Sequence, residues 1–228
     1  MKQKCYMCDN DGTTVEHVPP QCFFPEKKDL PHGVNLRRNL ITVPSCIEHN
    51  TKKSKDDEYV RFIVVSHIGN NLVAANLFLT KILRAIERRP ALRSVYNAET
   101  KAIVSDGVKA MAFKVNTSRY NTTMQKIMRG LYFHHYGEQC SLKIMVQTPA
   151  LLALKDCDPQ MVINMKKTLM AKATSFLNES SDKYGDNPEV FYYQIHREVH
   201  ESSLFVKMVF YEGVEVLGIS HPSILSAL

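Results

Sequence analysis

The sequence lacks any long uninterrupted apolar segment. Its longest strongly apolar run extends from Asn71 to Phe78, whereas a membrane-spanning helix needs roughly 20 such residues. The N-terminal residues MKQKCYMC also lack the apolar core of a secretory signal peptide. Internal repeats and low-complexity stretches are absent as well. We therefore expect a soluble, cytoplasmic protein that has no membrane partner.

Cysteines are too sparse for a disulfide-stabilised scaffold. The 228 residues include 6 cysteines, and Cys5 and Cys8 are separated by two residues, a spacing typical of zinc ligands in reducing compartments. Hydrophobic residues make up 44% of the chain and charged residues 23%, close to the averages of globular proteins. The formal charge of +6 permits a polyanionic partner without requiring one. The composition thus favours bound metal over disulfides, in one or two domains.

The composition of the chain changes at about residue 50. Residues 1–50 are rich in proline and glycine, which predicts loops and short strands with little core. A segment with so little core usually needs a cross-link to stabilise its fold, and a structural zinc ion is the obvious one here. From residue 50, apolar residues at helical spacing predict two helices, with a break near Gly69 and an end at Pro90.

The remaining half of the chain combines helical and strand-like patterns. Residues 124–136, followed by Gly137, predict a helix, as do residues 159–177. Near-alternation of aromatic and β-branched residues predicts two or three antiparallel strands, over 189–198, 202–211 and 213–220. We expect an α+β protein with a zinc-stapled module over residues 1–60. A mostly helical domain over 61–228, ending in a small antiparallel sheet, would serve targeting, a partner or oligomer formation.

Four residues form a plausible tetrahedral zinc set: Cys5, Cys8, Cys46 and His49. Each pair places two ligands on one tight turn, so two turns can close around one ion. Because all four positions would be filled by protein side chains, the site would be structural, with no place for a substrate. The alternative is that these are ordinary residues of a loop-rich segment. Any chemistry must therefore lie elsewhere.

A second constellation lies between and directly after the two zinc pairs. Glu16 can hold a hard divalent cation, while the neighbouring His17 can remove a proton from water. Asn50, brought near Glu16 if the chain folds back through the zinc, offers a carboxamide oxygen as a further ligand, although it can instead cap a helix. Asn39 can fix the orientation of the imidazole. These residues predict a hydrolytic site.

These segments together resemble the HNH endonucleases of the ββα-metal type. The resemblance covers roughly residues 1–60 and rests on the following residues: Cys5-x-x-Cys8, Glu16-His17-Val18-x-Pro20, Asn39-Leu40, Cys46-x-x-His49-Asn50 and Lys53-Ser54. The string LITVPSCIEHNTKKSKDDEYVR and, less specifically, RGLYFHHYG are similar to a small bacterial subgroup of this family. That subgroup is often encoded with defence or mobile-element genes, which implies a role against foreign nucleic acid.

The resemblance implies a role for each matching residue. His17 would be the general base, Asn39 would orient it, and Glu16 and Asn50 would bind a single catalytic Mg²⁺ or Mn²⁺. A further ligand often follows one helical turn later, where this sequence has Ser54. A serine hydroxyl is an unusual metal ligand. The metal can instead keep more water or bind Asp56 or Asp57, and the sequence leaves these alternatives open. His49 replaces the commoner Cys, and imidazole serves zinc equally well.

Three lysines at the start of the following helix complete the expected site: Lys52, Lys53 and Lys55. They can hold phosphates that flank the cleaved bond, although each can equally belong to a solvated face. We therefore expect a metal-dependent endonuclease that cuts nucleic acid, DNA rather than RNA, as a homo-oligomer or with a partner defence protein. The alternative hypothesis is a non-catalytic zinc-ribbon module that binds nucleic acid, or a regulatory partner subunit.

Overall fold

The structure is a computed structural model, and it describes most of the chain. The described residues are 3–51, 54–88, 100–105, 108–149, 182–200 and 202–220, with single positions between 151 and 177. The observed class is α+β, with a C-terminal antiparallel sheet and a Cys/His cluster near the N-terminus. Within the described residues, none of the helices has the length and apolar character that a membrane span requires.

The N-terminal part consists of short elements joined by loops, as its proline and glycine content predicts. Strands β1 (Thr14–His17) and β2 (Thr42–Ser45) pair antiparallel, with Glu16 opposite Val43 and His17 opposite Thr42. The loop between them contains the short helices η1 (Gln21–Phe23) and η2 (Lys27–Asp29). Helix α1 (Ile47–Thr51) follows β2. The order of elements is therefore strand, strand, helix.

The predicted helical region after residue 50 is confirmed, including its break. Helix α2 (Ser54–Val65) ends before Gly69, and α3 (Leu72–Leu77) begins after Asn71, whose side chain caps it by accepting from the amides of Val73 and Ala74. The π-helical segment η3 (Phe78–Ile82) and helix α4 (Leu83–Arg88) follow α3 without a break in the helix. Pro90, expected to end this helix, lies outside the described residues.

Helix α6 (Thr117–Tyr136) is longer than its predicted part, residues 124–136. It begins earlier because Asn116 caps it by accepting from the Arg119 amide. It ends as predicted at Gly137, which adopts φ 74° and donates its N–H to the Phe133 carbonyl. Such a left-handed residue is the common helix terminator, and glycine adopts it at least cost.

The three tail strands are confirmed as part of a larger sheet. They are β7 (Phe191–Glu198), β8 (Ser203–Phe210) and β9 (Val214–Ser220). Two short strands, β5 (Met145–Gln147) and β6 (Tyr184–Asn187), extend it to five strands in the order β5-β9-β8-β7-β6, all antiparallel. β6 has the sequence Tyr-Gly-Asp-Asn, and three of these four residue types are depleted in strands, so no sequence signal predicted it.

A separate hairpin, β3 (Thr100–Ser105) with β4 (Val108–Phe113), was also not predicted. The Asp106-Gly107 dipeptide between these two runs in the sequence is a strong hairpin signal and would have revealed it. The helix predicted over residues 159–177 lies mostly outside the described part of the chain. The division into domains 1–60 and 61–228 stays a prediction.

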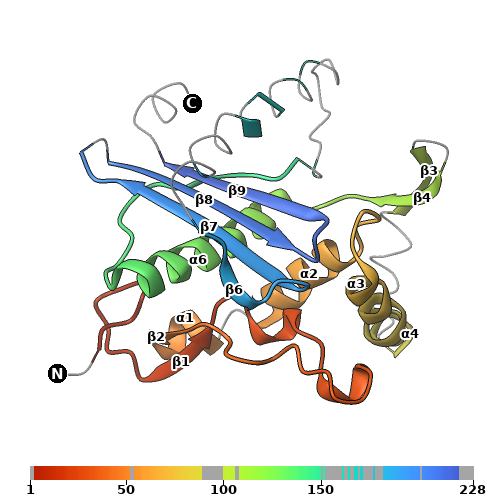
Figure 1. Cartoon of the computed structure of the whole chain (residues 1–228), viewed down its shortest axis with the longest axis horizontal. Coiled ribbons are helices and arrows are strands. Elements are labelled where there is room, and N and C mark those ends of the chain that lie inside the picture. Colours follow the sequence, from red (N-terminus) through yellow and green to blue (C-terminus); the bar gives the residue numbers. More distant parts are fainter. Residues whose placement is uncertain are drawn as a thin grey trace.

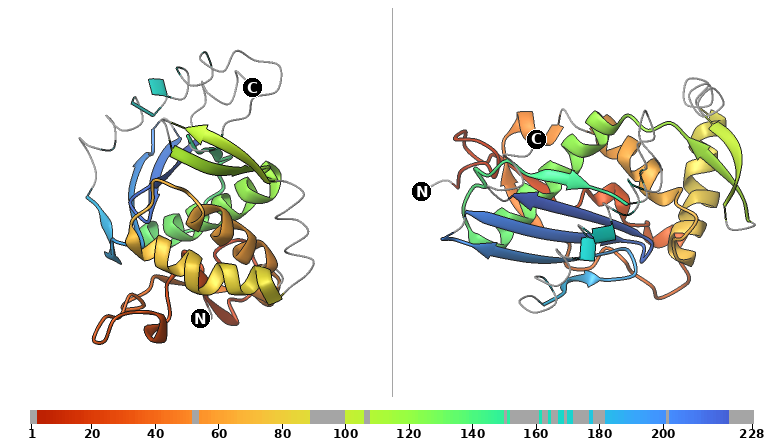
Figure 2. Two further views of the ribbon diagram at one scale, coloured as in Figure 1. Left: turned by 90° about the vertical axis from the view of Figure 1, so that its right-hand side faces the viewer. Right: turned by 90° about the horizontal axis from the view of Figure 1, so that it is seen from above.

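The elements form layers, with α6 and α2 between the sheet and the N-terminal elements (Figure 1). Met128 of α6 lies directly against Gly218 of β9, where an added Cβ would be 2.3 Å from the Met128 sulfur. The opposite face of the sheet contacts a smaller apolar cluster that includes Leu177 and Phe205. Two further views show the same arrangement, with the β3–β4 hairpin at one end of the molecule (Figure 2). One apolar core thus joins the N-terminal elements, the helices and the sheet.

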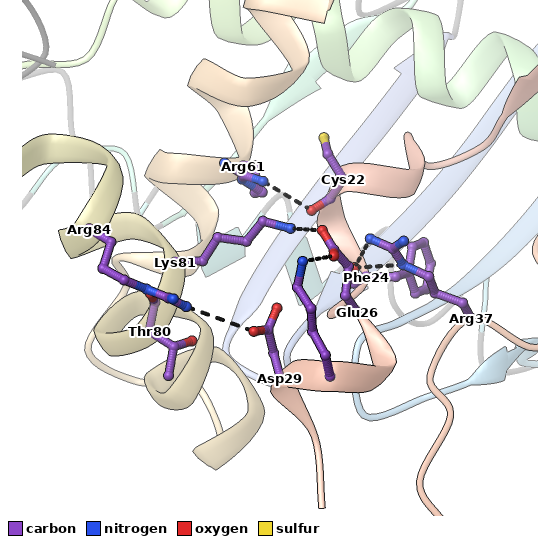
Figure 3. A network of polar contacts seen from close by, with 10 residues as sticks. Cys22, Phe24, Glu26, Asp29, Arg37, Arg61, Thr80, Lys81 and Arg84 are labelled. Atoms are coloured by element: carbon purple, nitrogen blue, oxygen red, sulfur yellow. Dashed lines mark hydrogen bonds and ion pairs between the residues drawn. The ribbon is translucent and has the colours of Figure 1, made fainter. Parts of the chain in front are cut away.

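The loop between β1 and β2 is fastened to α2, η3 and α4 by a polar network (Figure 3). Lys81 donates to Glu26 at 2.5 Å, and Lys28 pairs with the same carboxylate at 2.7 Å. Hydrogen bonds from these two ammonium groups lower the pKa of Glu26 to about 2. The Arg84 and Asp29 side chains face each other at 3.8 Å. These pairs add polar contacts to a loop whose Phe23, Phe24 and Leu36 are buried in the core.

The other side of α6 touches the segment that follows His17. A Cβ at Gly130 would lie 2.7 Å from Cγ2 and 3.0 Å from Cγ1 of Val18, which is 3% exposed. Glycine inside a helix is otherwise costly, by about 1 kcal/mol relative to alanine. Its presence at the middle of α6 is explained by this close approach, which sets the position of the chain directly after β1.

We predict that Gly130→Ala lowers the free energy of unfolding, because the clash with Val18 costs about 1–3 kcal/mol and outweighs the gain in helix propensity. Urea unfolding of the two single variants and of Gly130→Ala/Val18→Ala checks this. The double variant should be more stable than the sum of the single losses predicts, since removing the Val18 methyl groups makes room for the new Cβ. Strict additivity would contradict the proposed contact.

Candidate metal centre and adjoining polar site

The four predicted zinc ligands lie together. Cys5 and Cys8 occupy the turn before β1, Cys46 follows β2, and His49 belongs to α1. Pairing of β1 with β2, and a hydrogen bond of 2.9 Å from the Tyr6 amide to the Pro44 carbonyl, bring the two halves together. All four ligand atoms are within 4.8 Å of one another.

The spacing of these atoms fits tetrahedral zinc. The Nδ1 atom of His49 is 3.6 Å from the Cys5 sulfur, 3.4 Å from the Cys8 sulfur and 3.3 Å from the Cys46 sulfur. The Cys8 and Cys46 sulfurs are 3.9 Å apart. With Zn–S bonds of about 2.3 Å and Zn–N bonds of about 2.0 Å, the edges of a tetrahedron are about 3.8 Å between sulfurs and about 3.5 Å between sulfur and nitrogen. The four residues can therefore bind a metal such as zinc.

The chemistry of the cluster also suits a cation. Desolvation alone would raise the pKa of Cys46, but hydrogen bonds from the His49 amide and within the cluster lower it to about 6. A thiolate is the form that binds zinc. None of the cysteines in the described part of the chain forms a disulfide.

Gln139, which the sequence did not single out, supports the cluster from outside. Its side-chain nitrogen donates to the backbone carbonyls of Cys5 and Cys8, each at 2.8 Å. Gln139 follows the end of α6, more than a hundred positions from these cysteines. Hydrogen bonds of this kind hold metal-binding residues in place. No local pattern in the sequence could have indicated this contact.

Glu16 and His17 occupy the last two positions of β1. Adjacent strand residues point to opposite faces, and their burial differs accordingly: Glu16 is 5% exposed, whereas His17 is half-buried. Desolvation, followed by the nearby charge of Arg37, lowers the pKa of His17. The imidazole is therefore neutral at neutral pH, the form in which it can accept a proton.

Asn50 lies on the same side of β1 as Glu16. Its amide nitrogen donates to the Thr14 hydroxyl and to the Val15 carbonyl, each at 3.0 Å. Thr14 and Glu16 share one face of the strand because side chains alternate. Both hydrogens of the amide are used by β1, so the oxygen is the atom that can bind a cation. Asn50 is inside α1, where its N–H bonds to the Cys46 carbonyl, so the helix-cap alternative is wrong.

The acidic residues of α2 differ in their surroundings. Asp56 pairs with Arg119 at 2.5 Å. Asp57 is 7% exposed and lies near Tyr6: burial first, then the charges of Glu16, Cys5 and Asp57, raise the pKa of the Tyr6 hydroxyl. The charges of Glu16 and Asp57 therefore both act on this hydroxyl. Of the two aspartates that the sequence left open, Asp56 is bound by Arg119, and a cation-binding role of Asp57 stays a prediction.

Asn39 lies in the turn before β2, with φ 46°. Its side-chain amide donates to the Asp186 carboxylate of β6 at 2.6 Å. Its predicted contact with the imidazole stays a prediction. Asp186, like Gln139, is remote in sequence and was missed.

The remaining predicted residues are only partly described. Lys52 and Lys53 lie outside the described residues, as does the side chain of Ser54, the first residue of α2. Lys55 is exposed at the start of that helix, and its carbonyl accepts from Arg119. Its position is compatible with a phosphate contact and with a solvated face alike.

Comparisons with known proteins add no family assignment. No protein-family model, no curated protein and no solved structure matches this chain.

Proposed function

We propose that this chain is a metal-dependent endonuclease of the HNH type, which hydrolyses phosphodiester bonds of nucleic acid, DNA more than RNA. The observation that carries the proposal is that Asn50 of α1 donates to the Thr14 hydroxyl and the Val15 carbonyl of β1, the strand whose last two residues are Glu16 and His17. The Cys/His cluster, in which zinc would be structural, would join β1, β2 and α1.

The residues of the site suit phosphodiester hydrolysis. The neutral His17 imidazole accepts a proton from the attacking water and so acts as general base. Glu16 and Asn50, with Asp57 as a candidate third ligand, would hold one Mg²⁺ or Mn²⁺, hard cations that prefer oxygen ligands. That cation supplies positive charge to the phosphate as negative charge builds up on it and on the leaving oxygen. Lys55, with Lys52 and Lys53, would contact flanking phosphates without reading the sequence.

A cleavage assay with the purified full-length chain tests the proposal. Supercoiled plasmid, linear single-stranded DNA and RNA are each incubated with Mg²⁺, Mn²⁺ or EDTA, beside the variant Glu16→Gln. We expect cation-dependent cutting of DNA that EDTA abolishes and that Glu16→Gln reduces strongly, since an amide binds a hard cation more weakly than a carboxylate. Nicked products indicate cutting of one strand and linear products cutting of both.

Absence of cutting with either cation, together with retained binding of nucleic acid, would contradict the enzyme. That result would support the alternative, a zinc-ribbon module that binds nucleic acid without cleaving it. An active preparation whose rate does not depend on Glu16 would point to a contaminating nuclease. A role in defence against foreign nucleic acid rests on the family resemblance alone, and a test of phage plaque formation in cells that express the wild type or the variant addresses it.

A further inference from the structure

We propose that Asp186 is a positioning residue of the nuclease site, whose carboxylate holds Asn39 and the turn that carries it beside the end of β1. The inference rests on the proposed function. Asn39 and Asp186 are 147 positions apart in sequence, and the Nδ2 atom of Asn39 donates to Oδ2 of Asp186 at 2.6 Å. A hydrogen bond to an ionised acceptor is shorter and stronger than a neutral one.

A second contact from β6 holds the same turn. The Asn187 side chain, which is 3% exposed, donates to the Arg38 carbonyl at 2.8 Å. Asn39 itself has φ 46°, a left-handed conformation that few residues other than glycine adopt and that Asn tolerates best. Neighbouring residues of one strand thus fix an unfavourable backbone turn at consecutive positions, Arg38 and Asn39.

Strand β6 is irregular where it makes these contacts. Its pairing with β7 shifts register between Tyr184 and Asn187. Gly185 adopts φ 129°, and a Cβ there would lie 2.7 Å from the Phe191 carbonyl oxygen. Irregularities of this kind change the direction in which a side chain points from an edge strand, and they are common beside active sites. Here the residue that follows Gly185 is Asp186.

The turn at Arg38 and Asn39, which β6 contacts, leads directly to Thr42, the residue that pairs with His17. The Val18 amide donates to the Ile41 carbonyl at 2.9 Å, and His17 pairs with Thr42. The same turn carries Arg37, whose guanidinium donates twice to the Phe24 carbonyl, at 3.1 and 2.9 Å. Asp186 therefore connects the C-terminal sheet to the segment that flanks the general base, where small displacements of reacting groups reduce the rate strongly.

The test compares Asp186→Ala, the conservative Asp186→Asn and the control Asp182→Ala, which removes an exposed aspartate of the same segment. For each, single-turnover cleavage of DNA is measured at saturating protein, beside the Kd for that DNA, zinc content and Tm. We expect Asp186→Ala to slow cleavage by about 10- to 100-fold, as is typical for groups that hold catalytic side chains. The Kd, zinc content and Tm should stay at wild-type values, Asp186→Asn should recover most of the rate, and Asp182→Ala should lose none.

A double variant shows whether Asp186 acts through Asn39. Asn39→Ala/Asp186→Ala should cleave no more slowly than Asn39→Ala alone, because the partner is already absent. Losses that multiply, or an Asp186→Ala variant as fast as wild type, would overturn the positioning role while the nuclease proposal stands. A rate that extra Mn²⁺ restores would make Asp186 a cation ligand and also overturn it. A wild type that cuts no substrate would refute the nuclease and this role together.

Discussion

His17→Ala should reduce cation-dependent cleavage by about 10²- to 10⁴-fold, the usual contribution of a general base. The expectation follows from the position of this imidazole at the end of β1, next to Glu16, and from the desolvation that keeps it neutral. Alanine removes the proposed proton acceptor but leaves Glu16 and Asn50, the proposed cation ligands, in place. The measurement is the single-turnover rate on the substrate that the wild type cuts best, beside the Kd for that substrate.

His32→Ala is the matched control, because His32 is exposed in the loop between β1 and β2. Its rate should equal that of the wild type. The Kd of His17→Ala should also be unchanged, since binding depends mainly on phosphate contacts. A His17→Ala variant that cuts at the wild-type rate would remove His17 from the mechanism, whatever the protein proves to bind.

Cys46→Ser should lose the zinc ion and several kcal/mol of unfolding free energy. Structural zinc in small domains is bound with about 10 kcal/mol or more, and much of that is folding free energy. The loss of several kcal/mol corresponds to a fall in Tm of about 10 °C or more for a chain of this length. Zinc content by elemental analysis and Tm by circular dichroism measure the two effects. Cleavage should be lost as well, because β1, β2 and α1 are joined through this cluster.

Cys22→Ser is the matched control for that loss. Cys22 is a half-buried cysteine of η1 in the same N-terminal segment that forms no disulfide, and it does not belong to the cluster. This variant should keep its zinc and change the unfolding free energy by about 1 kcal/mol or less, the usual effect of a single substitution. Equal zinc loss in both variants, or wild-type zinc in Cys46→Ser, would contradict the assignment of the ligands.

Elements with strong periodicity were predicted well from the sequence. The spacing of apolar residues alone shows which face of an element is buried. This holds for the two helices around Gly69, the C-terminal half of α6 and the strands β7 to β9. Strands β5 and β6 were missed because pairing with β9 and β7 creates them. Their own residues, such as Gly185, give no strand signal.

The sequence by itself predicted the four residues of the Cys/His cluster, which can bind a metal such as zinc, because two pairs of ligand residues at short spacing can close on one ion with little help from the rest of the chain. The strand–strand–helix order around Glu16, His17 and Asn50 was implied by the resemblance to the ββα-metal nucleases, and the structure has this order of elements. Only the tertiary structure showed that Arg119 of α6 binds Asp56, since the two residues lie far apart in the sequence. Only the tertiary structure brought Gln139 to the cysteine turn and Asp186 to Asn39. Such contacts join residues more than a hundred positions apart, and they depend on how α6 and the sheet pack on the N-terminal elements, which no local pattern encodes.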